Sequence, residues 1–261
     1  MKAIDIIKKL DDIYSPSFAA GWDNTGLQCG ETSCDVKGIY VALDCTGKVI
    51  DEALKKGCNM IVTHHPMIFS PIKSVTDRDI FGKRIIKLIK NNMFLFSLHT
   101  NYDILRMSLV NSSEMNIEPD TVLKAEGTDD NGEPYGFGFA GDLESRCTLR
   151  QFAEKLKKIY HLEKIRVYGD PDSFISRAAM CSGSGKGFLD DALRLGADVF
   201  ITGDMDHHTA IDAVMKGISV IDGSHFGTEM CFVPDMANLI RSSFPEIIVV
   251  EDLTEQAYSI I

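Results

Sequence analysis

Short apolar runs alternate with amphipathic stretches along the first half of the chain. The apolar runs predict strands at residues 39–43, 60–63 and 93–98, because they are short and rich in β-branched and aromatic side chains. Helical spacing of apolar positions predicts helices at residues 4–10, 49–56 and 81–89, with a further short helix that opens at Asp103. Nearly continuous apolar strands separated by helices are typical of an α/β fold with strands buried on both faces.

The second half repeats this alternation. It predicts strands near residues 136–141, 165–168, 176–181, 199–202 and 218–221, and helices near residues 149–159, 187–195, 207–216 and 226–240. Residues 113–134 are the most polar and least periodic stretch, which is typical of a connection. We therefore predict a first α/β subdomain at 1–112, a connection at 113–134 and a second α/β subdomain at 135–261.

The two halves contain an internal repeat. Residues 51–63 align without a gap on residues 190–202, with five identical positions. Further on, His99-x3-Asp103 pairs with His225-x3-Glu229, and the offset falls from 139 to 126, so the first copy carries 13 extra residues. Chance similarity between two βα units is the simpler explanation. We favour a true repeat, because the potential metal ligands recur together with the scaffold.

Three groups of metal-binding residue types follow predicted strands. They are Thr63-His64-His65-Pro66, His99-x3-Asp103 and His225-x3-Glu229. Strand ends are where open α/β sheets place their chemistry, and imidazole with carboxylate suits zinc, manganese, iron or cobalt. A histidine and an acid four residues apart at a helix start lie on one face and can chelate one ion. Five or six ligands shared by two ions leave coordination positions for water, which is typical of hydrolytic two-metal sites.

Other motifs leave alternatives open. His99 is a ligand, a partner that positions a ligand, or a general acid/base, and we favour the last two roles. His207 and His208 begin a predicted helix, where a proton shuttle and an exposed or capping role are equally supported. The glycine-rich run 181–187 precedes a helix and could bind an anion or form only a tight turn, and it lacks the P-loop spacing. The loop 21–27, with the only Trp, is a substrate lid or a packed loop.

Composition limits the partners and the location. The chain has 261 residues and a formal net charge of −11, so its field disfavours non-specific nucleic-acid binding. It contains no apolar stretch long enough to span a bilayer and no signal peptide, which predicts a cytoplasmic protein without membrane contact. Seven cysteines without a Cys-x2-Cys pair indicate reduced thiols.

The motifs resemble those of the YbgI-type dinuclear-metal hexameric proteins, commonly labelled GTP cyclohydrolase I type 2 homologs. The matching residues are Trp22-Asp23-Asn24-x-Gly26-Leu27, the strand end at residues 63–66, His99-Thr100-Asn101-x-Asp103, Thr202-Gly203-Asp204 with His208, and His225-x-x-Thr228-Glu229. The resemblance covers nearly the whole chain in the same order. Ser224 is a departure, since a glycine before the last histidine is more typical, and it predicts a slightly altered turn.

The resemblance implies a homohexamer of two-subdomain α/β protomers, with two divalent metal ions in a cleft between the subdomains. It implies a ligand set of His64, His65, Asp103, His225 and Glu229, with Glu229 bridging the ions. We hypothesise a metal-dependent hydrolase that acts on a small phosphorylated or nucleotide substrate, with metal-activated water as nucleophile and His99 as its acid/base partner. The alternative is a non-catalytic metal-binding scaffold or regulatory protein; a DNA-binding role is disfavoured by the acidic charge.

Overall fold

The structure, a computed structural model, describes residues 1–252 and divides them into two compact units. The first unit comprises Met1–Tyr102 and, among the described residues, 232–252. Its five-stranded sheet has the order β1-β4-β3-β2-β11, in which β2, β3, β4 and β11 are parallel and β1 is antiparallel to β4. The bounds are Gly26–Cys29 (β1), Gly38–Ala42 (β2), Met60–Thr63 (β3), Phe94–Ser97 (β4) and Ile248–Glu251 (β11).

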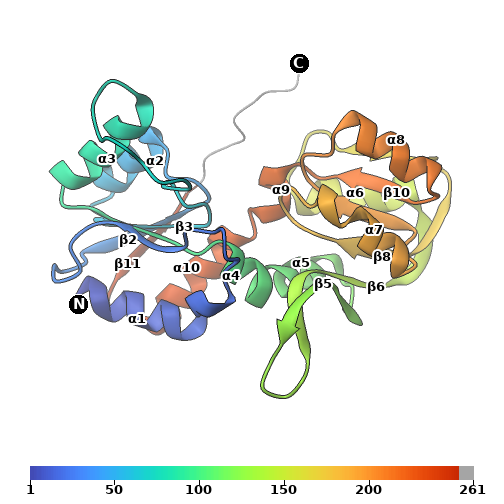
Figure 1. The fold of residues 1–261 in the computed structure, drawn as a ribbon, viewed down its shortest axis with the longest axis horizontal. Helices are drawn as coiled ribbons and strands as arrows, with labels where there is room; N and C mark the ends of the chain where they lie inside the picture. Colours follow the sequence, from blue (N-terminus) through green and yellow to red (C-terminus); the bar gives the residue numbers. More distant parts are fainter. Residues whose placement is uncertain (253–261) are drawn as a thin grey trace. The chain divides into compact units, whose positions relative to one another are not determined.

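Helices cover both faces of this sheet. Figure 1 shows α2 and α3 on one face and α1 and α10 on the other. The helices are α1 (Ala3–Ile13), α2 (Gly47–Lys55), α3 (Ile80–Lys90), α4 (Thr100–Tyr102) and α10 (Phe232–Ser243), with a 3-10 turn at Pro16–Phe18. Thr46 and Asp79 cap the amino ends of α2 and α3 through their side-chain oxygens, and each cap contributes about 1 kcal/mol. With both faces covered, every residue of β2, β3 and β4 is buried, as their apolar runs predict.

The second unit, Asp103–Cys231, contains a six-stranded sheet of order β5-β6-β8-β9-β10-β7. Strands β8, β9 and β10 are parallel, and the other pairings are antiparallel. The strands are β5 (Thr121–Thr128), β6 (Pro134–Thr148), β7 (Arg166–Tyr168), β8 (Phe174–Met180), β9 (Val199–Thr202) and β10 (Ser219–Asp222). The helices are α5 (Ser108–Met115), α6 (Leu149–Ile159), α7 (Leu189–Arg194), α8 (His207–Met215) and α9 (His225–Glu229), with a π-helical turn at Asp103–Met107 and a 3-10 turn at Lys186–Phe188.

Alternate residues of β9 pack in two separate hydrophobic cores of this unit. Ile201 packs in the cluster that contains Leu156 of α6, whereas Phe200 packs in the cluster that contains Ala192 of α7 and Ala213 of α8. Successive side chains of a strand point to opposite faces of the sheet, so a continuous apolar run suits a strand that is covered on both sides.

The internal repeat is visible in the strand pairing. The parallel strands β2, β3 and β4 of the first unit correspond to β8, β9 and β10 of the second, in the same order and direction. The register of the first two strands agrees at the offset of 139, since Val41 pairs with Val62 and the equivalent Met180 pairs with Ile201. In the third strand, Thr63 pairs with Ser97 and Thr202 pairs with Asp222, which is one residue away from the offset of 126 that aligns the two ligand motifs. The predicted α/β class with two related units is confirmed.

The unit boundaries differ from the predicted subdomain limits. The stretch 113–134, predicted as a connection, contains β5, which is polar because it is an edge strand with half of its residues exposed. The chain passes between the units at Tyr102/Asp103 and again at Cys231/Phe232, because β11 pairs with β2 and so belongs to the first sheet. Residues 253–261 of the predicted second subdomain lie outside the described residues. Within residues 1–252, no helix has both the length and the apolar character that a membrane crossing requires.

Candidate metal centre

Three histidines follow two neighbouring strands of the first sheet, at the same edge of that sheet. Strands β3 and β4 end in register, with Thr63 opposite Ser97, so the residues that follow them are brought together. The ligand atoms of His64, His65 and His99 lie within 4.8 Å of one another. His64 is fully buried, while His65 and His99 are partly exposed. We call these three residues the first-unit histidine group.

Oxygen atoms fix the orientation of the two adjacent imidazoles in this group. His64 Nδ1 lies 2.9 Å from the carbonyl oxygen of Leu98, and His65 Nδ1 lies 3.1 Å from Asp44 Oδ1. Carbonyl and carboxylate oxygens can only accept a hydrogen bond, so in each ring Nδ1 is the donor. Nε2 is therefore the nitrogen that can ligate a metal, which is the usual arrangement for metal-binding histidines.

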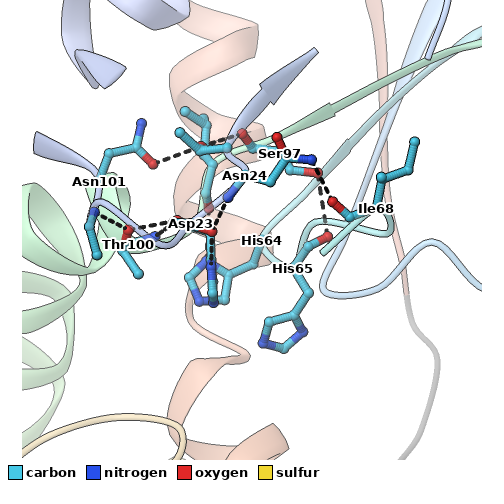
Figure 2. A network of polar contacts seen from close by, with 12 residues as sticks. Asp23, Asn24, His64, His65, Ile68, Ser97, Thr100 and Asn101 are labelled. Carbon is cyan, nitrogen blue, oxygen red and sulfur yellow. Dashed lines mark hydrogen bonds and ion pairs between the residues drawn. The ribbon is translucent and has the colours of Figure 1, made fainter. Parts of the chain in front are cut away.

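Asp23 positions the third imidazole. His99 Nδ1 donates to Asp23 Oδ1 over 2.9 Å. The other carboxylate oxygen of Asp23 accepts from Thr100 N (3.1 Å) and Thr100 Oγ1 (2.6 Å), and Figure 2 shows Asp23 beside Thr100. Burial favours a raised pKa for Asp23, but the hydrogen bonds from His99 and Thr100 outweigh it and lower the pKa to about 2. Asp23 is thus a carboxylate at neutral pH.

Asp23 lies in one of the family motifs, but its place in the sequence indicates no role for it. The residue lies 76 positions from His99 in the chain, so no local spacing connects them. The available signal was an acid next to the only Trp in a glycine-flanked loop. The loop is anchored by hydrogen bonds through Asp23, which favours a fixed loop over a mobile lid, although Trp22 itself is exposed.

The second unit carries a histidine and a carboxylate in one short helix. His225 begins α9 and Glu229 ends it one turn later, with His225 Nε2 at 3.1 Å from Glu229 Oε2. His225 Nδ1 donates to Asp204 Oδ2 over 2.8 Å, so Nε2 is again the ligating nitrogen. Glu229 is buried, at 4% exposure. We call His225 and Glu229 the second-unit ligand pair.

Ser224 gives the turn before His225 an unusual backbone. Its φ of 59° and ψ of 152° lie in a region that is almost restricted to glycine. The side chain compensates in part, because Ser224 Oγ accepts from Gly227 N at 2.9 Å and caps α9. The departure from the family's glycine therefore places a strained residue directly beside His225.

The glycine-rich run packs against the second-unit ligand pair. Gly183 has a φ of +62°, and a Cβ atom at this position would lie 2.2 Å from Glu229 Oε1 and 3.4 Å from His225 Nε2. Its amide donates to Thr228 Oγ1 over 2.9 Å, which holds the turn in place. The absence of a side chain at Gly183 is what allows the turn to approach the two ligands so closely.

Asp103 begins the π-helical turn of the second unit and is half-buried. The helix it was predicted to open starts earlier, at Thr100 in α4. Burial raises the pKa of the Cys181 thiol, and the carboxylates of Asp103 and Glu229 raise it further. Both acids thus act on the same thiol of the glycine-rich run.

His207 and His208 lie at the exposed start of α8, with ring centroids 5.3 Å apart. The cap of this helix is Asp206, whose side chain accepts from Thr209 N over 3.0 Å. Neither histidine is therefore the capping residue. Of the roles predicted for them, a proton shuttle and an exposed position remain.

The fold and the strand-end histidines define a class: α/β proteins built from two repeat-related units, with His and Glu groups that could bind a metal ion. The chain belongs to the Duf34/NIF3 (NGG1p interacting factor 3) family, whose model matches residues 1–256. A relative from Clostridium acetobutylicum, named GTP cyclohydrolase 1 type 2 homolog, is 36% identical over 246 residues, 93% of this chain and 91% of the relative.

Solved structures agree with this assignment. A hypothetical protein from Staphylococcus aureus matches with a TM-score of 0.93 and 29% identity, over 100% of this chain and 99% of that chain. Reduced HcgD from Methanocaldococcus jannaschii matches with a TM-score of 0.82 and 29% identity, over 97% and 98% of the two chains. Protein ybgI shares the fold, with a TM-score of 0.84 at 21% identity over 98% and 100%. The predicted family resemblance is confirmed.

Proposed function

We propose that the chain is a metal-dependent hydrolase that uses two divalent metal ions and acts on a nucleotide or another small phosphorylated compound. The proposed ligands are His64, His65, Asp103, His225 and Glu229, and the proposed acid/base residue is His99. The names of the curated relatives, GTP cyclohydrolase 1 type 2 homologs, make GTP the first substrate to test.

One observation carries the proposal. Each of the four histidines His64, His65, His99 and His225 has its Nδ1 at 2.8–3.1 Å from a carboxylate or carbonyl oxygen. This contact fixes the tautomer, raises the basicity of Nε2 and holds the ring in one orientation. Structural histidines need no such uniform arrangement, whereas metal-binding histidines almost always have it.

The donor set also fits the proposed ions. Imidazole nitrogens and carboxylate oxygens, without thiolate, suit zinc, manganese, iron or cobalt. When bound, such ions supply Lewis acidity for the attack of water on a substrate. Glu229 would hold the ions through its carboxylate, and the absence of a side chain at Gly183 leaves space beside Glu229 Oε1.

His99 and Asp23 form the proposed proton-transfer unit. Asp23 accepts the Nδ1 hydrogen of His99 and stays ionised, so Nε2 of His99 can take a proton and return it. Asp23 stabilises the imidazolium while the ring holds that proton. Buried, hydrogen-bonded support of this kind keeps the ring in a productive orientation.

Glu229→Gln tests the function. We expect the purified variant to hold fewer metal ions per chain than the unmodified protein and to lose metal-dependent turnover of GTP, since the amide keeps the shape of the side chain and removes its charge. Metal analysis by mass spectrometry and a product assay on GTP, a phosphomonoester and a phosphodiester measure the two effects. The control is Glu246→Gln, which alters an exposed glutamate.

Two results would contradict the proposal. Full metal content in Glu229→Gln would remove this residue from the ligand set. A metal-loaded wild-type protein that leaves all three substrates unchanged would instead support the alternative function, a non-catalytic metal-binding scaffold.

A further inference from the structure

Two exposed aromatic rings flank His99 in the first unit. Trp22 is 62% exposed and Phe69 is 52% exposed, and their ring centroids lie 5.9 Å apart. The centroid of the His99 ring lies 6.1 Å from that of Trp22 and 6.5 Å from that of Phe69. Large aromatic side chains gain considerable stabilisation from burial, so two that remain in solvent beside a candidate catalytic residue indicate a binding surface.

Hydrogen bonds of neighbouring residues connect the two segments that carry the rings. Trp22 precedes Asp23, which is anchored to His99 and Thr100. On the other side, Asn24 Nδ2 donates to the carbonyl oxygen of Ile68 over 2.5 Å, a contact drawn in Figure 2. The loop that carries Trp22 is thereby tied to the residue directly before Phe69.

Gln28 strengthens the same connection. Its Oε1 accepts from Ile68 N at 3.1 Å, and its Nε2 donates to the carbonyl oxygen of Asn24 at 2.5 Å. The two chain segments that carry the rings are therefore joined before any ligand arrives, which lowers the entropy lost on binding.

The internal repeat shows that the segment that carries Phe69 is an addition to the first copy. Phe69 lies in the segment 64–79 between β3 and α3, whereas only residues 203–206 separate β9 from α8 in the second copy. Ile72 and Val75 of the same segment are also exposed, at 40% each. The second copy folds without such a segment. The fold of the repeat therefore does not explain why the Phe69 ring lies beside His99.

We propose that Trp22 and Phe69, whose ring planes are inclined by 54°, form an aromatic platform for the planar heteroaromatic ring of the substrate, with a nucleobase as the ligand class. The ligand ring stacks on one of the two side chains and meets the other at its edge. The inference rests on the proposed function, because it takes His99 as part of the reactive site. Base stacking on aromatic side chains tolerates any base, since every base has a π-face. Aromatic rings in contact usually have centroids 4.5–7 Å apart, and both platform rings lie within this range of the His99 ring. A ligand ring on the platform therefore lies next to His99.

The only tryptophan of the chain makes a direct test possible. Metal-loaded protein is titrated with GTP and, separately, with inorganic tripolyphosphate, while Trp22 fluorescence is recorded. We expect GTP to quench the emission with saturation and tripolyphosphate to leave it unchanged. Equal quenching by both compounds would overturn the proposal, because tripolyphosphate has no ring.

Calorimetry on variants gives the second measurement. Trp22→Ala and Phe69→Ala should each weaken GTP binding by about 5-fold to 100-fold, whereas Trp22→Phe retains a ring and most of the affinity. The matched control is Phe174→Ala, which removes an aromatic side chain of 59% exposure in the second unit. Unchanged GTP affinity in both alanine variants would overturn the proposal, whether or not the variants keep the oligomeric mass of the wild type.

The outcomes also separate the platform from the proposed function. Saturable quenching by GTP without turnover supports the platform and contradicts the hydrolase. Turnover with an unchanged kcat/KM in Trp22→Ala and Phe69→Ala contradicts the platform and leaves the hydrolase in place.

Discussion

Single hydrogen bonds at the Nδ1 atoms decide which imidazole nitrogen is available for chemistry. His64 differs from the other three histidines in using a backbone carbonyl, that of Leu98, instead of a carboxylate. Its ring is also fully buried, so it cannot reorient without disturbing the core. We therefore expect the orientation of His64 to be the least adjustable of the four.

Asp23→Asn tests the role of His99. An amide can donate to the ring, which favours the opposite tautomer, so we expect turnover to fall by about 10²-fold or more. Metal content decides between the open roles: it stays unchanged if His99 is the acid/base residue and falls if His99 is a ligand. Steady-state kinetics with metal analysis make the measurement, and the exposed Asp77→Asn is the control. Unchanged turnover would remove the Asp23–His99 pair from the mechanism.

Ser224→Gly should stabilise the protein. The serine backbone is strained by about 1–3 kcal/mol, and glycine relieves this while losing only a few tenths as a helix cap. Ser224→Ala keeps the strain and loses the cap, so it should lower the free energy of unfolding by about 1 kcal/mol. Urea unfolding of metal-free protein compares the two. A Ser224→Gly variant less stable than wild type would show that the turn is not strained.

At the scale of elements, strand ends and the turns after them carry the candidate site. The first-unit histidine group follows β3 and β4, and the second-unit ligand pair follows β10. The glycine-rich run follows β8, and its two predicted alternatives were an anion site and a tight turn. Its contact with Glu229 gives this turn a supporting role at the ligand pair.

Gly183→Ala tests this supporting role. A Cβ atom would displace the Glu229 carboxylate, so we expect metal affinity to fall by about 10-fold to 100-fold, the usual effect of disturbing the residues that hold metal ligands. The matched control is Gly196→Ala, which has a similar φ of +73° but open space around the added atom. Metal titration of both variants measures the difference. Equal affinities would mean that Glu229 is not held by the turn.

At the scale of the whole molecule, each unit contributes its own candidate ligands. Metal binding should therefore stabilise the chain by mass action, by about 2.7 kcal/mol when the free ion is at about 100 times its Kd. Removing the ions with a chelator should lower Tm by roughly 5–10 °C, and adding zinc or manganese should restore it. Scanning calorimetry measures the shift. Glu229→Gln should respond less to the chelator; an equal shift would indicate that the ions bind elsewhere.

The homohexamer stays a prediction at this scale. Sedimentation at equilibrium should give six times the 28.9 kDa mass of the chain if it is correct.

Most central elements could be predicted from the sequence because their patterns are local. The apolar runs gave β3 and β9 at their observed bounds, and the periodicity of residues 149–159 gave α6. The edge strands β1 and β5 were missed, since half-exposed strands have mixed side chains that resemble loops. The edge strand β11 was also missed, although its residues Ile248, Val249 and Val250 form an apolar run. The segment 226–240, predicted as one helix, forms α9 and α10 because the chain leaves the second unit at Cys231 and enters the first at Phe232.

The sequence by itself determined the family, the repeat and the candidate ligands, because motif residues and apolar periodicity are properties of short segments. The tertiary structure alone decided which oxygen orients each histidine, that Asp23 belongs with His99, and that Trp22 and Phe69 lie beside it. These contacts join residues far apart in the chain, such as the 76 positions between Asp23 and His99, and only strand pairing brings such residues together.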